Sequence, residues 1–174
     1  MNKLIVLSGV PGSGKSYFSK TVKNVKNSHV YVVSSDELRR EITGIQSNLS
    51  EDILMWKIFY SLAKTYSLDK EGVVILDATH VNSHLRVDKI RNMKKLFDEI
   101  YLVMWNIDRH VVSNQNLQRD FPIPPDILDK FYEIFEPPTQ KDKDFFDKIL
   151  MITSSDIASV INELNLQVSE GLPE

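Results

Sequence analysis

The stretch GVPGSGKS, residues 9–16, decides the fold. It matches G-x-x-x-x-G-K-[ST] without a gap, and it lies between an apolar run at residues 4–7 and a helical pattern at residues 16–25. Its glycines allow successive backbone N–H groups to turn inward, and the helix that follows adds partial positive charge. The stretch therefore predicts a phosphate-binding loop between a first strand and a first helix.

This loop also predicts the cofactors, which are ATP and Mg²⁺. We expect Lys15 to reach the β- and γ-phosphates and the Ser16 hydroxyl to hold the metal ion. The alternative is a glycine-rich turn that binds nothing, but the strand before the loop and the helix after it favour the nucleotide site. The expected cofactor-binding residues are Gly9, Gly12, Ser13, Gly14, Lys15, Ser16 and Tyr17.

Beyond the loop, apolar runs alternate with helical stripes, which is typical of a parallel sheet covered by helices. We expect the α/β three-layer P-loop NTPase fold, with a five-stranded parallel sheet flanked by helices. Residues 1–174 would form a single kinase domain with a small helical lid at about 109–126. The expected strands are 4–7, 30–33, 73–76, 100–105 and 149–152, and the expected helices are 16–25, 50–66, one from Asn82 or Ser83, 109–119, 126–135 and 155–164.

Composition limits the class of protein. The 174 residues carry a net charge of −3, so the chain as a whole is not a basic nucleic-acid binder, although a local basic groove is compatible with it. The absence of cysteine excludes disulfides and thiolate zinc sites. The sequence contains no run of 18 apolar residues, so no membrane span is expected. The N-terminal residues do not resemble a signal peptide. We expect a cytoplasmic protein without a membrane partner.

The residues around the third expected strand favour a kinase over a motor or a GTPase. A motor strand commonly ends in adjacent acids, whereas Asp77 is followed by Ala78. The guanine-reading N-K-x-D pattern is absent as well. The remaining class is a small P-loop kinase, in which the phosphate acceptor is a hydroxyl.

The stretch SSDELRRE, residues 34–41, follows the second expected strand and supplies the groups that such a kinase needs. We expect Asp36 to act as the catalytic base and Arg39, on the same side of a helix, to face the phosphates. Parallel strands bring their ligands to the carboxyl edge of the sheet, which places Asp36 near the loop. The alternative is a helix start in which Ser35 or Asp36 caps the helix and Arg39 is solvated.

The stretch DATHVNSHLR, residues 77–86, is expected at the same edge of the sheet. We expect Asp77, Thr79 and Asn82 to line this edge, with a substrate or metal contact for Asp77. The alternative is that Asp77 and Thr79 hold a turn while Asn82 caps the next helix. His80 is expected to line this edge as well, with Arg86 one turn into that helix, but for His80 and His84 we expect a surface-loop role in place of a catalytic one.

A polar helix followed by a proline-bounded segment, NQNLQRDFPIPPDIL at residues 114–128, suggests the lid. Arg119 could swing in and neutralise charge on the transferring phosphoryl group. The alternative is a solvated helix end, where an arginine suits the negative dipole. The expected catalytic residues are thus Lys15, Asp36, Arg39 and Arg119.

Together these motifs resemble the phage-type polynucleotide 5′-hydroxyl kinases, which are AAA-type, adenylate-kinase-like P-loop kinases. The residues 34–41 are similar to that family's D-x-x-R, in which the aspartate is the base and the arginine contacts the scissile phosphate. The residues 76–86 are similar to its D-x-[TN]-x-x-N. This similarity implies acceptor-side contacts for Asp77, Thr79 and Asn82. Arg119 matches the lid arginine, but Gln115 stands where a second one is expected. The resemblance covers about residues 3–152.

The resemblance implies transfer of the γ-phosphate to the 5′-hydroxyl of a polynucleotide. A nucleoside, sugar or antibiotic hydroxyl is the alternative acceptor. A regulatory module that binds ATP without transferring phosphate is a further alternative. Relatives hold the base near the positions of Ser154 and Ser155, although a helix cap also explains Ser155.

Overall fold

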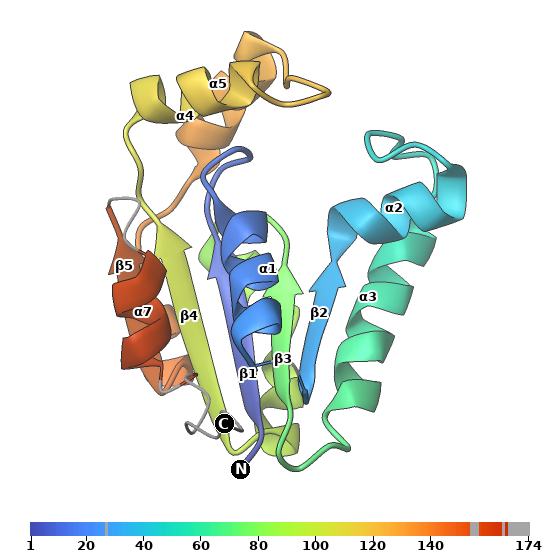
Figure 1. The fold of residues 1–174 in the computed structure, drawn as a ribbon, viewed down its shortest axis with the longest axis vertical. Coiled ribbons are helices and arrows are strands. Elements are labelled where there is room, and N and C mark those ends of the chain that lie inside the picture. Colours follow the sequence, from blue (N-terminus) through green and yellow to red (C-terminus); the bar gives the residue numbers. More distant parts are fainter. Residues whose placement is uncertain (27, 154–156, 165, 167–174) are drawn as a thin grey trace, which may run out of the picture.

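A computed structural model describes residues 1–26, 28–153, 157–164 and 166. Its centre is a sheet of five parallel strands in the order β2-β3-β1-β4-β5 (Figure 1). This confirms the predicted fold class. The strands are β1 (Lys3–Ser8), β2 (Val30–Ser34), β3 (Val73–Asp77), β4 (Glu99–Trp105) and β5 (Lys148–Ile152).

Helical segments cover both faces of the sheet and its upper end (Figure 1). A π-helical turn and a short 3₁₀ helix, named η1 and η2, follow β3. The helical segments are α1 (Lys15–Lys26), α2 (Ser35–Thr43), α3 (Asp52–Tyr66), η1 (His84–Asp88), η2 (Arg91–Leu96), α4 (Arg109–Leu117), α5 (Pro125–Ile134), α6 (Gln140–Phe145) and α7 (Ile157–Glu163). None of the helices in the described ranges is long and apolar enough to cross a membrane.

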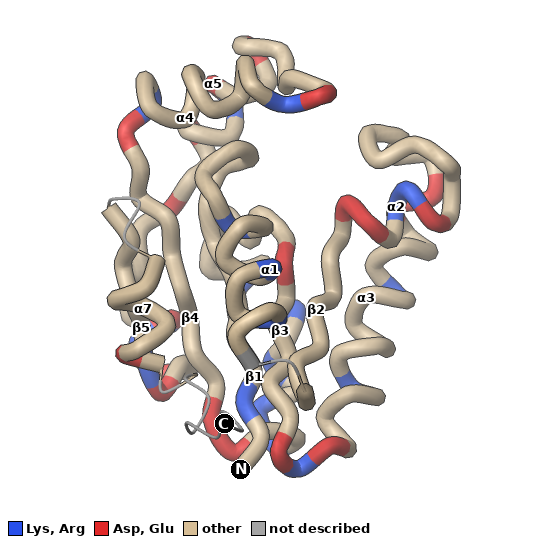
Figure 2. Tube along the Cα trace, viewed as in Figure 1, with Lys and Arg blue, Asp and Glu red and all other residues tan. Residues whose placement is uncertain are grey.

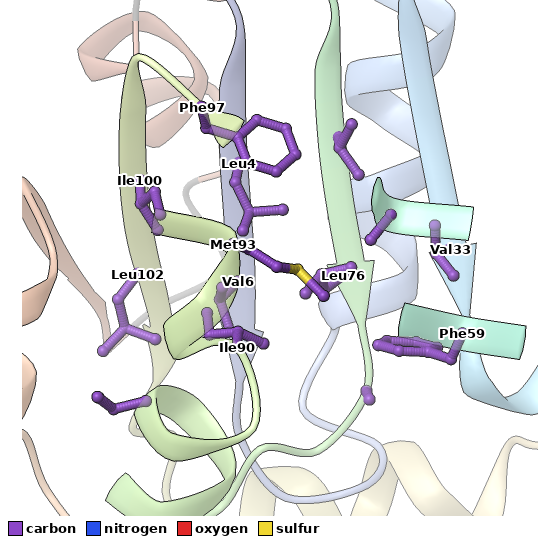
Figure 3. Packing of buried hydrophobic residues seen from close by; sticks show 14 of the residues in the cluster. Leu4, Val6, Val33, Phe59, Leu76, Ile90, Met93, Phe97, Ile100 and Leu102 are labelled. Atoms are coloured by element: carbon purple, nitrogen blue, oxygen red, sulfur yellow. The ribbon is translucent and has the colours of Figure 1, made fainter. Parts of the chain in front are cut away.

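The central strand β1 contributes side chains to two hydrophobic cores, one on each face of the sheet. Successive side chains of a strand point to opposite faces. Leu4 and Val6 join the core formed with α3, η2 and α6, part of which Figure 3 shows. Ile5 and Leu7 join the core formed with α1 and α7. The strand is therefore apolar throughout, and its carboxyl end is held rigidly where the glycine loop begins.

Two helix predictions were wrong in detail. The single helix expected from residue 82 or 83 is instead η1 followed by η2, with Ile90 outside helical geometry between them. The fully buried Arg86 lies within η1. The helix expected from Ser50 begins at Asp52, because the Ser50 amide bonds to the side chain of Asn48.

The helix α6 was not predicted at all. It is only six residues long, and a capping box between Thr139 and Asp142 starts it directly after two prolines. The signal T-x-x-D was present in the sequence. The helix expected at 155–164 is observed as α7, while its first two residues lie outside the described ranges.

Candidate functional site

The glycine loop lies at the carboxyl end of β1, between strand and helix as predicted. Its backbone could not carry side chains at the first glycine: a Cβ on Gly9 would lie 2.9 Å from both the Trp105 Cβ and the Ser13 Oγ. Gly12 adopts φ +82°, which L-residues with a Cβ rarely do. The loop is therefore a cradle of backbone amides, the form required to hold phosphate oxygens.

Lys15 turns inward over this loop. Its ammonium donates to the carbonyl oxygens of Gly9 at 2.9 Å and Val10 at 2.8 Å. Burial lowers its pKa to about 8, partly opposed by the negative charges of Asp77 and Asp36. The Ser13 hydroxyl is its third partner, at 3.5 Å. A buried cation whose partners are all neutral oxygens is well suited to receive an anion.

Asp77 ends β3 beside the loop. It is 6% exposed, and burial raises its pKa against the opposing effects of Lys15 and of hydrogen bonds from Ser16 and Ser19. The carboxylate therefore lies next to the hydroxyl that was predicted to hold Mg²⁺. Among the described residues, no group of three or more His, Cys, Asp or Glu side chains is placed so that it could hold a metal ion. A magnesium ion would thus depend on Ser16, Asp77, water and the phosphates.

The turn after Asp77 is hydrogen-bonded to the start of the loop. The Gly9 amide donates to the Thr79 carbonyl at 2.9 Å, and the Ser8 hydroxyl donates to the His80 carbonyl at 2.8 Å. His80 Nδ1 donates to the Leu7 carbonyl at 2.8 Å. These bonds fix the loop relative to β3.

His80 corrects the expectation of a surface role. It is 2% exposed, and burial lowers its pKa to about 4, so the ring is neutral at physiological pH. Its partners are backbone groups that the sequence pattern did not reveal. His84, by contrast, is on the surface as expected, 3.1 Å from Asp88.

Asp36 lies in the first turn of α2, directly after β2. The cap of this helix is Ser34, whose hydroxyl accepts from the Glu37 amide at 3.3 Å, and not Ser35 or Asp36. The Asp36 carboxylate is thus free of a capping role, and its side chain is 47% exposed. Because Ser34 pairs with Asp77 in the sheet, Asp36 shares an edge with the loop and its charge affects Lys15.

Arg39 contacts Asp36, as the spacing predicted, at 3.2 Å. It also binds Asp52 of α3, with Nε at 2.7 Å from one carboxylate oxygen and Nη2 at 3.4 Å from the other. The guanidinium packs over the Trp56 ring, 5.8 Å from its centroid. Asp52 and Trp56 were not identified from the sequence, because the contact joins two helices across a turn. Residues of both charge signs follow one another along α2 (Figure 2).

Asn82 and Arg86, both expected at this edge, have structural partners. The Asn82 side-chain oxygen accepts from the Leu85 amide at 3.0 Å at the start of η1, whose cap position is Ser83. Arg86 is fully buried and makes two 2.9 Å bonds to Asp142. Its remaining donors reach the carbonyl oxygens of Val81, Glu136 and Pro137.

The helices α4 and α5 lie above the loop (Figure 1). Their apolar side chains form a small cluster around Val10 of the loop, which includes Val112 and Leu128. Arg119 follows the end of α4, and its guanidinium lies 3.9 Å from where a Gly12 Cβ would be. Its charge lowers the pKa of Lys15, so the two cations belong to one site.

Two further residues complete the description of the site. Asn116 is buried and bonds to both the amide and the carbonyl of Ile123, which shapes the segment that carries Arg119. Tyr17 is 67% exposed on α1. The expected base-binding positions, Ser154 and Ser155, lie outside the described residues.

A parallel sheet with this glycine loop at the carboxyl end of its central strand defines a P-loop NTPase fold. The chain belongs to the AAA domain family AAA_33, whose model matches residues 4–138. The match confirms the AAA-type, P-loop part of the resemblance, while membership of the phage-type polynucleotide 5′-hydroxyl kinases stays a prediction.

Individual proteins agree with this assignment. The L-seryl-tRNA(Sec) kinase of Methanococcus maripaludis is 27% identical over 176 residues, which cover 96% of this chain and 66% of that protein. The chain therefore spans just under two thirds of the length of this relative.

Solved structures show the same fold. Kti12 of Chaetomium thermophilum, solved with ADP-AlF3, superposes with a TM-score of 0.70 at 16% identity and covers 96% of this chain and 100% of that one. A gluconokinase from Sinorhizobium meliloti 1021 gives 0.62 at 16% identity, with 92% and 88% covered.

Proposed function

We propose that the protein is an ATP-dependent kinase that transfers the γ-phosphate to a hydroxyl group. The observation that carries the proposal is the position of Asp36, at the same edge of the sheet as the inward-facing Lys15. Asp36 is free of a capping role and half exposed at the same edge of the sheet. A domain that only senses nucleotide has no need of an accessible carboxylate at this position.

In this proposal Asp36 accepts the proton of the acceptor hydroxyl. The oxygen of that hydroxyl forms a bond to the γ-phosphorus, and the bond between the γ-phosphorus and the ADP oxygen breaks. Lys15, Arg39 and Arg119 neutralise the charge on the transferring group, and the loop amides hold the β-phosphate. Bound magnesium supplies charge neutralisation between the phosphates. Ser16 would ligate the ion and Asp77 would orient that hydroxyl, while Thr79 and Asn82 border the acceptor side.

Two acceptors fit this site. The motif order favours the 5′-hydroxyl of a polynucleotide. Two observations favour a small hydroxyl compound. The Arg39 guanidinium is already engaged by Asp52 and Asp36. Gln115 stands where a second lid arginine is expected. An acceptor with few phosphates would not need those charges.

The test is phosphate transfer from γ-labelled ATP to a panel that includes a 5′-hydroxyl oligonucleotide, nucleosides, sugars and seryl-tRNA. We expect Asp36→Ala to lower the transfer rate by about 10²–10⁴-fold and to leave ATP affinity unchanged. Glu37→Ala, an exposed neighbour on the same helix turn, is the matched control.

Wild-type turnover by Asp36→Ala would contradict the assigned base. Tight ATP binding with no transfer to any acceptor would instead support the regulatory module.

A further inference from the structure

A glutamine in the connection between α2 and α3 contacts the proposed base. Gln46 Nε2 donates to Asp36 Oδ2 at 2.7 Å. The other carboxylate oxygen, Oδ1, accepts from Arg39 at 3.2 Å. Asp36 is therefore held from two sides, by a residue of its own helix and by one from outside it.

This connection has an ordered backbone conformation. Gly44 ends α2 at φ +79°, which reverses the chain, and its amide bonds to the Arg40 carbonyl at 2.8 Å. The Ile45 amide bonds to the Thr43 hydroxyl at 3.2 Å, and the Asn48 amide to the Ile45 carbonyl at 3.1 Å. The turn therefore presents Gln46 toward α2 in a defined position.

We propose that Gln46 is a positioning residue for catalysis, which fixes the carboxylate of Asp36 in the orientation that receives the acceptor's proton. This inference rests on the proposed kinase function. An ionised carboxylate has about four acceptor sites, of which Gln46 and Arg39 occupy one on each oxygen. A site on each oxygen remains for the acceptor hydroxyl, so the hydrogen bonds orient the base without blocking it.

The chemistry of the amide suits this role. A neutral donor favours the ionised, proton-accepting form of a carboxylate and adds no charge that would compete with the phosphates. The charged groups that influence Asp36 are Arg39 on α2, Lys15 on α1 and Asp77 on β3, with Asp52 of α3 sharing Arg39. Gln46 is the uncharged member of this group.

Two substitutions test the role. Gln46→Ala removes the hydrogen bond, and we expect kcat to fall about tenfold to a hundredfold with an unchanged KM for ATP. Gln46→Glu places a second negative charge beside Asp36, and we expect the acid limb of the kcat/KM profile to move up by about one pH unit. Asn48→Asp adds the same charge two residues along the chain and is the matched control, with an unmoved profile.

A second measurement does not depend on activity. The ¹³C carboxyl resonance of Asp36 should change at a higher pH in Gln46→Glu than in the wild type or in Asn48→Asp. Identical titrations in all three proteins, or wild-type kcat in Gln46→Ala, would overturn the inference. If the titration moves as expected but the wild type transfers phosphate to no acceptor, the proposed function fails while the contact between Gln46 and Asp36 stands.

Discussion

Two arginines of this protein bind carboxylates in opposite ways. Arg86 of η1 binds Asp142 of α6, and both side chains are 0% exposed. Arg39 lies at the proposed site with a side chain that is 13% exposed, and its partners Asp36 and Asp52 are 47% and 31% exposed. Arg86 also has carbonyl partners for its remaining donors, whereas Arg39 packs against a tryptophan ring.

This difference in burial indicates that the Arg86 pair stabilises the fold, whereas the Arg39 pair is available for contact with a ligand. A buried, fully satisfied pair cannot lose one member without leaving the other charge in a dry environment. A partly exposed pair can exchange a partner for water or for a phosphate at little cost. From the sequence, Arg39 was expected to face the phosphates, whereas Arg86 was only placed at the same edge of the sheet, one turn into a helix.

The largest effect should come from Arg86→Ala. Because Asp142 would be left buried without its partner, we expect the free energy of unfolding to fall by about 3–5 kcal/mol. Urea denaturation monitored by circular dichroism measures it. Arg91→Ala, which removes an arginine that is 64% exposed, should change stability by less than about 1 kcal/mol. Equal effects in the two variants would remove the distinction between buried and exposed pairs.

Arg39→Ala should show the reverse balance. The two carboxylates that it leaves behind can be hydrated, so we expect a stability loss of about 1 kcal/mol. The transfer rate should fall by about 10²–10³-fold, since in the proposed mechanism Arg39 helps to neutralise the transferring phosphoryl group. Steady-state kinetics and urea denaturation of the same preparation measure both. A loss of stability as large as that of Arg86→Ala would mean that Arg39 is structural.

A smaller effect is expected from acid. Hydrogen bonds from Arg86 and Thr139 hold the pKa of Asp142 below its ordinary value, although burial alone would raise it. A carboxylate of this kind stabilises the fold above about pH 4 and loses that contribution as the pH falls further. A tenfold change in proton affinity corresponds to about 1.4 kcal/mol. Unfolding free energies measured from pH 5 to pH 2 should therefore fall less steeply in Asp142→Asn than in the wild type.

Local signals were enough to predict the sheet and the loop. The strands are uninterrupted apolar runs, and the pattern of residues 9–16 fixes both the strand before it and the helix after it. The position of Asp36 followed from the rule that parallel strands present ligands at their carboxyl ends. These features depend on neighbours in sequence or on the sheet alone.

Contacts between distant segments were not predictable. Arg39 meets Asp52, and Gln46 meets Asp36, only because Gly44 reverses the chain after α2. The burial of His80 depends on a carbonyl of β1, 73 residues away. Arg86 binds Asp142 across 56 residues. No periodicity in a single segment encodes such pairs.

Val10 belongs to two structures at once. Its carbonyl accepts from Lys15 at 2.8 Å, while its side chain packs with Val112 and Leu128 of the helices above. Those helices consequently rest on the loop itself. In the proposed kinase, a nucleotide that drew Lys15 away would therefore disturb the surface that supports them. Thermodynamic reciprocity then applies: by whatever factor closure of these helices strengthens nucleotide binding, nucleotide strengthens closure.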